Sequence, residues 1–208
     1  MRIIFFDTET TGLPKSKKIS ALDASNNWPD LVSICWMVFD GKQHVRTENH
    51  MIKPKGWSIP KESSNIHGIT EAVANREGKS LSEVLSLFKH DIQSAGYIIA
   101  HNLHFDKHVV FHAYKWRLGV DPRPFWNSEA ELCTAELSKD EMKLVGMYTK
   151  PGEYKFPRLD ELYESTFKCP APENAHNALR DVEVLQKIVW KRWDLRDDDG
   201  VIINTGKN

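Results

Sequence analysis

Runs of apolar residues alternate with polar segments along the chain, and the first three runs have the length of strands. Residues 2–7 are rich in Ile and Phe, which is typical of a strand covered on both faces. Residues 31–40 and 44–52 also predict strands, and the hairpin signal Asp40-Gly41 lies between them. We therefore expect an antiparallel meander, with an aperiodic loop over residues 14–30.

Helical spacing dominates the rest of the chain. Ser80 and Glu83 have the spacing of a capping box, and apolar residues follow them at helical intervals. Helices are predicted over residues 81–94, after the polar turn 101–106, over 159–166 and over 175–193; a short strand is predicted over 97–100, and a strand or helix near 131–137. This order predicts an α/β fold with a mixed central sheet, an antiparallel meander plus parallel strands, flanked by helices.

Length and charge limit the possible functions. A chain of 208 residues fits one domain, which we expect over residues 1–195, with a loose tail over 196–208. The net charge of −1 argues against a protein that coats nucleic acid, so any such substrate would be bound locally. The three cysteines lack the spacing of a zinc knuckle or a disulfide framework. With no leader sequence and no long apolar run, we expect a cytoplasmic protein without membrane contact.

Two carboxylates follow the first strand. Side chains alternate between the faces of a strand, so Asp7 and Glu9 point the same way, about 6.5 to 7 Å apart. Such a pair is repulsive unless a cation lies between the carboxylates, and Mg²⁺ and Mn²⁺ prefer oxygen ligands. The alternative is that the strand has reached solvent and the pair is a hydrated surface patch.

Two further acidic positions are candidates for the same site. Asp106 follows the predicted strand 97–100, at the edge where α/β sheets bind ligands, although a helix start also favours an acidic residue. Asp181 lies in the apolar stripe of the last helix, where an unpaired carboxylate is costly. It therefore needs a metal, an Arg or a backbone donor as its partner. His176, five residues earlier, is near enough to share the site, although a lone histidine there is more often a cap or surface residue.

Three segments together resemble the motifs of the DEDDh family of 3′-to-5′ exonucleases, which have a ribonuclease H-like fold. The segments are DTETTGL at 7–13, HNLHFD at 101–106 and HNALRD at 176–181. The resemblance extends to IHGIT at 66–70 and KFPRLDELYESTF at 155–167. It is greatest to stand-alone bacterial relatives of the DNA polymerase III epsilon subunit. The segment ELCTAELSK from Glu131 departs from the family pattern, which often has Asp-Thr there.

The resemblance implies a two-metal site. Asp7, Glu9, Asp106 and Asp181 would bind two divalent ions, Mg²⁺ or Mn²⁺, and His176 would be the general base. Paired ions of this kind stabilise the attacking and leaving oxygens of a phosphodiester displacement. A neutral histidine can take a proton from the attacking water at ordinary pH.

The resemblance also implies a pocket for the terminal nucleotide. Its residues would be Thr10, Thr11, Gly12, Leu13, Ile66, His67, His101, Asn102 and Phe105. Flat or apolar side chains meet any base face, which suits an enzyme without sequence preference. For Leu13 and Phe105, ordinary core packing is an equal alternative.

The expected activity is removal of nucleoside monophosphates from DNA 3′ ends, with single strands preferred. Trimming of RNA 3′ ends is an alternative, and a non-catalytic nucleic-acid-binding module is another. The last would be expected to lack one of the five motif residues, all of which are present here. The chain ends soon after the third motif, so we expect no stable polymerase partner of the kind that epsilon subunits hold through a longer tail.

Overall fold

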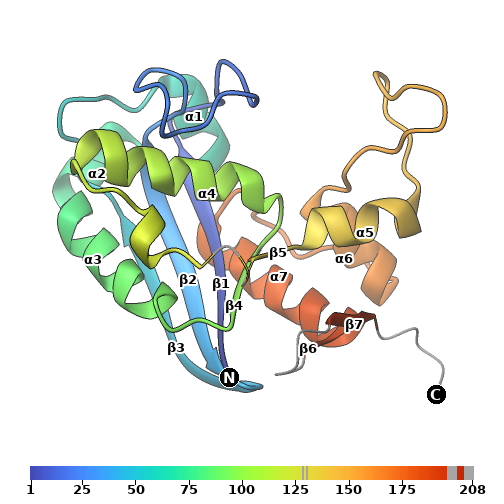
Figure 1. Ribbon diagram of the computed structural model, residues 1–208. Coiled ribbons are helices and arrows are strands. Elements are labelled where there is room, and N and C mark those ends of the chain that lie inside the picture. The colour runs from blue at the N-terminus through green and yellow to red at the C-terminus, as the bar shows by residue number, and fades with distance from the viewer. Residues whose placement is uncertain (128, 130, 196–200, 204–208) are drawn as a thin grey trace.

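The centre of the fold is a five-stranded mixed sheet. The computed structural model describes residues 1–127, 129, 131–195 and 201–203. The strand order is β3-β2-β1-β4-β5, so β1 is central (Figure 1). The strands are β1 (Arg2–Thr10), β2 (Leu31–Asp40), β3 (Gln43–Met51), β4 (Tyr97–Ala100) and β5 (Glu131–Cys133).

Strand pairing confirms the predicted combination of a meander and parallel strands. β1 pairs antiparallel with β2, and β2 pairs antiparallel with β3 across the hairpin at Asp40. On its other side β1 runs parallel to β4, and β4 runs parallel to β5. The register of β1 against β2 shifts between Glu9 and Thr10. Such a bulge bends the strand just after the second carboxylate of the first motif.

Helices cover both faces of the sheet (Figure 1). One face packs Ile4 and Phe6 against α3 (Leu81–Ile92) and α4 (Leu103–His112). The other packs Ile3 and Phe5 against α6 (Leu159–Phe167) and α7 (Ala178–Arg192). The four β1 residues are at most 1% exposed, because helices occupy both sides of this strand. The strand alternation of β1 thus assigns each of its side chains to one helical layer.

The loop over residues 11–30 is anchored to itself by side chains. Asn27 donates from Nδ2 to the carbonyl of Ser16 at 2.8 Å and accepts from the Ser16 amide at 2.9 Å. Trp28 donates from its indole nitrogen to the carbonyl of Ile19 at 2.7 Å. Both side chains are at most 5% exposed. The loop, which the sequence predicts to lack regular structure, is therefore held by hydrogen bonds between its own residues.

Several elements differ from the prediction or extend it. Two short helices, α1 (Lys61–His67) and α2 (Glu71–Glu77), were not predicted. The segment 131–137 contains both alternatives, since β5 runs directly into α5 (Thr134–Met142). The remaining elements are a π-helical turn (Ala113–Arg117), a 3₁₀ turn (Arg123–Phe125), β6 (Trp193–Leu195) and β7 (Val201–Ile203).

The expected loose tail, 196–208, lies mostly outside the described residues. Within it, Val201–Ile203 pairs with β6, a contact that the sequence did not predict. Among the helices described, none has the length and apolar character needed to cross a membrane.

Candidate active site

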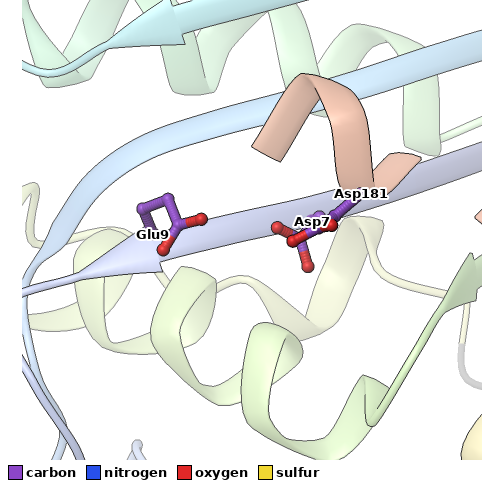
Figure 2. A group of neighbouring side chains, drawn as sticks. All are labelled: Asp7, Glu9 and Asp181. Carbon is purple, nitrogen blue, oxygen red and sulfur yellow. The ribbon is translucent and has the colours of Figure 1, made fainter. Parts of the chain in front are cut away.

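Three carboxylates meet at the carboxyl end of β1. Asp7 and Glu9 project from β1, and Asp181 reaches them from the first turn of α7 (Figure 2). Each residue offers one carboxylate oxygen, and these oxygens lie within 4.8 Å of one another. The alternation of β1 therefore directs both of its carboxylates toward the α7 layer.

Asp106 lies on the opposite helical layer and is held by the residue between the two β1 carboxylates. It occupies the first turn of α4 and is 3% exposed. Its Oδ1 accepts from the Thr8 amide at 3.1 Å and from the Thr8 hydroxyl at 2.6 Å. Asp106 therefore lies in the first turn of a helix, and its carboxylate is also held against β1 at Thr8.

Asp181 has the partners that its place on an apolar stripe requires. Its Oδ1 accepts from Nη1 of Arg180 at 2.7 Å, and its Oδ2 accepts from the backbone amide of His176 at 3.1 Å. A carboxylate oxygen has two lone-pair positions, so each oxygen keeps one for a further ligand. An arginine partner and a metal-binding role are therefore compatible at Asp181.

Burial and mutual repulsion raise the pKa values of the carboxyl groups. Burial raises the pKa of Glu9 to about 8, and the charges of Asp181 and Asp106 act in the same direction. Burial also raises the pKa of Asp106 to about 7, although the hydrogen bonds from Thr8 lower it. The pKa of Asp7 is raised well above its ordinary range, first by burial and then by its three acidic neighbours.

These observations fit a site for divalent cations. The donors are all carboxylate oxygens, which are the ligands that Mg²⁺ and Mn²⁺ prefer. The raised pKa values of Glu9 and Asp106 show that the negative charges are only partly compensated by protein groups. A divalent cation would reduce this repulsion, so the residues present fit a divalent cation.

A cavity of about 560 Å³ lies above the carboxylates. It brings together nearly all the residues that the motifs indicate, with Thr11 as the exception. Thr11 instead accepts from the Asp30 amide through its hydroxyl at 2.9 Å and donates its own amide to the Asp30 carbonyl. The predicted residues that line the cavity are Asp7, Glu9, Thr10, Gly12, Leu13, Ile66, His67, His101, Asn102, Phe105, Asp106, His176 and Asp181.

His176 lies in the segment immediately before α7. Its backbone is in the left-handed region, with φ of 63°, and its side chain is exposed at the edge of the cavity. The bond from its amide to Asp181 fixes the backbone of His176 relative to the carboxylates. The imidazole is therefore available to a ligand in the cavity.

The apolar residues of the cavity differ in exposure. Leu13 is 79% exposed and Ile66 is 60% exposed, which rules out core packing for Leu13. Phe105 is partly buried against the α3–α4 core and also lines the cavity. Exposed apolar side chains at a cavity edge are available to pack against the flat face of a base.

His101 connects two walls of the cavity. Burial lowers the pKa of His101 to about 4, so the ring is neutral at ordinary pH. Its Nδ1 lies 2.9 Å from the Thr134 hydroxyl, and its Nε2 lies 2.9 Å from the Pro157 carbonyl. Because a carbonyl only accepts, Nε2 carries the proton and donates to Pro157. Both ring nitrogens are thus engaged within the protein.

Sequence reasoning missed several lining residues. They include Thr8, Lys17, Ser63 and residues 156–159.

 Lys17 belongs to the aperiodic loop predicted over residues 14–30, and the structure places it at the cavity. Strand alternation would have assigned Thr8 to the α4 layer that holds Asp106. Residues 156–159 follow an aperiodic segment, so no pattern indicated their position.

Taken together, the sheet order and the carboxylates at the end of its central strand define a domain of the ribonuclease H-like fold. The family model described as exonuclease matches residues 4–189. The chain therefore belongs to the exonuclease family. No curated protein sequence matches the chain.

Solved structures with a similar fold include exonuclease I from two bacteria. The E. coli enzyme in complex with a dT13 oligonucleotide is 19% identical, with a TM-score of 0.67, over 90% of this chain and 40% of that one. The enzyme from Methylocaldum szegediense is 17% identical, with a TM-score of 0.66, over 92% of this chain and 40% of that one. The chain thus spans about two fifths of their length, and at these identities the likeness concerns the fold alone.

Proposed function

We propose that the chain is a divalent-metal-dependent 3′-to-5′ exonuclease that removes nucleoside monophosphates from DNA ends, with single strands preferred. The observation that carries this proposal is the cluster of Asp7, Glu9 and Asp181, whose oxygens lie within 4.8 Å of one another. Asp106 and His176 line the same cavity. This combination supports phosphodiester hydrolysis, in which water adds to the phosphorus of the last phosphodiester and the 3′ oxygen of the preceding nucleotide leaves.

The four carboxylates would hold two divalent ions, Mg²⁺ or Mn²⁺. When bound, such ions make water more acidic and stabilise charge on the attacking and leaving oxygens. The role proposed for the exposed His176 imidazole is to accept the proton of the attacking water. Thr8 and Arg180 hold Asp106 and Asp181 in place through the hydrogen bonds described above.

The rim of the cavity supports a substrate without base preference. Leu13 and Ile66 are exposed apolar side chains that can pack against any base face. E. coli exonuclease I, which shares the fold, has been solved with both a dT13 and a dA16 oligonucleotide. These observations favour DNA over RNA in the proposal.

A 3′-labelled single-stranded DNA oligonucleotide tests the proposal. With Mg²⁺ or Mn²⁺ the wild-type chain should release labelled mononucleotide, and D181A and H176A should each release it at least about 100-fold more slowly. D140A, which removes an exposed carboxylate on α5, is the matched control and should cut normally. Absence of mononucleotide, or wild-type cleavage by D181A, would contradict the mechanism. Faster cleavage of a matched RNA oligonucleotide would contradict the choice of DNA.

A further inference from the structure

A long loop leaves the body of the domain between α5 and α6. Residues 143–158 form this loop, which we call the arm, and it projects past both helices, away from the central sheet (Figure 1). Two of its side chains, Met147 and Tyr148, are 91% and 93% exposed. Val145 is 72% exposed. Neighbouring exposed apolar side chains of this size are typical of a surface that contacts a ligand or partner.

Hydrogen bonds hold the tip of the arm in one conformation. The Gly146 amide donates to the Thr149 hydroxyl at 2.7 Å, and the Thr149 amide donates to the Gly146 carbonyl at 3.1 Å. This closed turn has Met147 and Tyr148 at its corner. Below it, the Lys155 amide donates to the Leu144 carbonyl at 2.8 Å and joins the two sides of the arm. The exposed side chains are therefore presented by an ordered turn.

The arm is positively charged, although the chain as a whole is not. Its sequence contains four cationic residues and one acidic residue, Glu153, which gives a charge of +3 against −1 for the whole chain. Lys155 is paired with Glu161. Arg158 is exposed, with its Nε 3.6 Å from the same carboxylate, and Lys143 and Lys150 are exposed as well. A polyanion would therefore be attracted to the arm.

The base of the arm is a wall of the cavity. Phe156, Pro157 and Arg158 line the same cavity as the carboxylates, and the Pro157 carbonyl accepts from His101. The ammonium of Lys139 lies 5.5 Å from the centroid of the Phe156 ring, within the range of a cation–π contact. Aromatic and cationic groups are thus present both at the base of the arm, beside the cavity, and farther along it.

We propose that the arm binds the single-stranded part of a nucleic acid whose 3′ end lies in the cavity. Tyr148 and Met147 pack against bases upstream of that end, and Lys143 and Lys150 contact phosphates. This inference rests on the proposed function. Alternating apolar or aromatic and cationic groups are the features by which proteins hold single strands without reading sequence. A second protein chain in this place would not account for the excess positive charge of the arm, whereas a nucleic acid does.

Binding measured without turnover tests the arm separately from catalysis. In EDTA, fluorescence anisotropy would compare the wild-type chain with M147A/Y148A on a labelled oligonucleotide of about 16 nucleotides, the upper range for single-strand sites. We expect the double variant to bind at least about 5-fold more weakly. A labelled dinucleotide should bind both proteins equally. V45A/L87A, which removes exposed apolar side chains from β3 and α3, is the matched control.

The salt dependence of binding tests the lysines. Each lost contact to a single-stranded phosphate lowers the slope of log affinity against log salt by about 0.7, so K143Q/K150Q should lower it by about 1.4. Equal slopes for the variant and the wild type would overturn the role of the lysines.

Further measurements distinguish nucleic-acid binding by the arm from contact between copies and from catalysis. Unchanged affinity of M147A/Y148A for the long oligonucleotide overturns it. A wild-type dimer in sedimentation that M147A/Y148A dissociates, with unchanged oligonucleotide affinity, also overturns it and assigns the arm to contact between copies. Hydrolysis of a small chromogenic ester of thymidine monophosphate should be unaffected by M147A/Y148A. If the wild-type chain binds oligonucleotide through the arm but hydrolyses nothing, the proposed function fails while the arm proposal stands.

Discussion

Arg180 connects Asp181 to two other segments of the cavity wall. Its Nη1 donates to Oδ1 of Asp181 at 2.7 Å, and its Nη2 lies 2.8 Å from Oδ1 of Asp160 on α6. Nη2 also donates to the carbonyl of Pro172, in the segment that leads to His176. One guanidinium therefore fixes α6, α7 and the segment before α7 relative to one another, and it sets the orientation of the Asp181 carboxylate.

Replacement of Arg180 should weaken metal binding. Loss of a group that orients a metal ligand typically lowers metal affinity about 10- to 100-fold, and we expect this for R180Q. R180K should recover only part of the affinity. Lysine keeps the positive charge, but its ammonium lacks the planar fork that can hold two carboxylates. Isothermal titration with Mn²⁺ measures the affinity without any need for turnover.

The matched control for R180Q is R192Q. Arg192 lies on the same helix, and its side chain is likewise 10% exposed and paired with a carboxylate, that of Glu141. If R180Q bound Mn²⁺ as the wild type does, or R192Q were equally weakened, Arg180 would have only a structural role.

The Thr8 hydroxyl should stabilise ionised Asp106. Hydrogen bonds to charged groups contribute about 1.5 to 3 kcal/mol, so T8V should lower the free energy of unfolding of the metal-free protein by about this amount above pH 8. The pKa of Asp106 is about 7, so the loss should be smaller near pH 5, where the carboxyl is protonated. Urea denaturation at both pH values measures it. T8S, which keeps the hydroxyl, is the control, and an equal loss at both pH values would indicate packing alone.

The metal-free protein should lose stability as pH rises. The pKa of Glu9 is raised from 4.5 to about 8 by burial and by its acidic neighbours. Between these values the unfolded chain releases a proton that the folded chain retains, so stability is complete below 4.5 and falls up to about 8. Each 1 kcal/mol lost lowers the Tm by about 2 to 4 °C in a chain of this size.

Thermal unfolding in EDTA at several pH values measures this fall. Mg²⁺ or Mn²⁺ should reduce it, because a cation favours the ionised carboxylates. E9Q should reduce it in EDTA, since glutamine has no proton to release. A Tm that rises from pH 5 to pH 8 in EDTA would contradict the assignment of the stability loss to the raised pKa of Glu9.

Asn27 should hold the loop that carries Leu13 and Lys17. N27A removes both side-chain bonds to Ser16 and leaves partly buried backbone groups without these partners, which should cost about 1 kcal/mol. The loop should then be cut faster in limited proteolysis, and KM for an oligonucleotide should rise more than kcat falls. N127A, at an exposed asparagine, is the control. Equal proteolysis of N27A and the wild type would show that Trp28 alone suffices to hold the loop.

The sequence predicted the elements whose burial follows a regular period. β1, α3 and α7 all have apolar residues at strand or helix spacing, because each packs a long face against the core. The helices α1 and α2 have only seven residues each. In α1 the only large apolar residue, Ile66, is exposed, so no apolar stripe marks this helix.

The site was predictable to the extent that it depends on local spacing. Alternation placed Asp7 and Glu9 on one face, and helical spacing placed Asp181 in an apolar stripe. The pairing of Arg180 with Asp160 was not predictable, because it depends on how α6 packs against α7. The same holds for the arm, whose aperiodic sequence carries no information on where its base meets the cavity.

The long separation along the chain between the site residues has a consequence for synthesis. Thr8 bonds to Asp106 across 98 positions, and the carboxylate cluster requires Asp181 as well as Asp7. A ribosome builds the chain from its N-terminus, so the central strand and α4 emerge long before α7. The three-carboxylate cluster therefore cannot assemble on the nascent chain until α7 has left the exit tunnel. While the growing polypeptide is still attached to the ribosome, close to messenger RNA, it lacks this cluster.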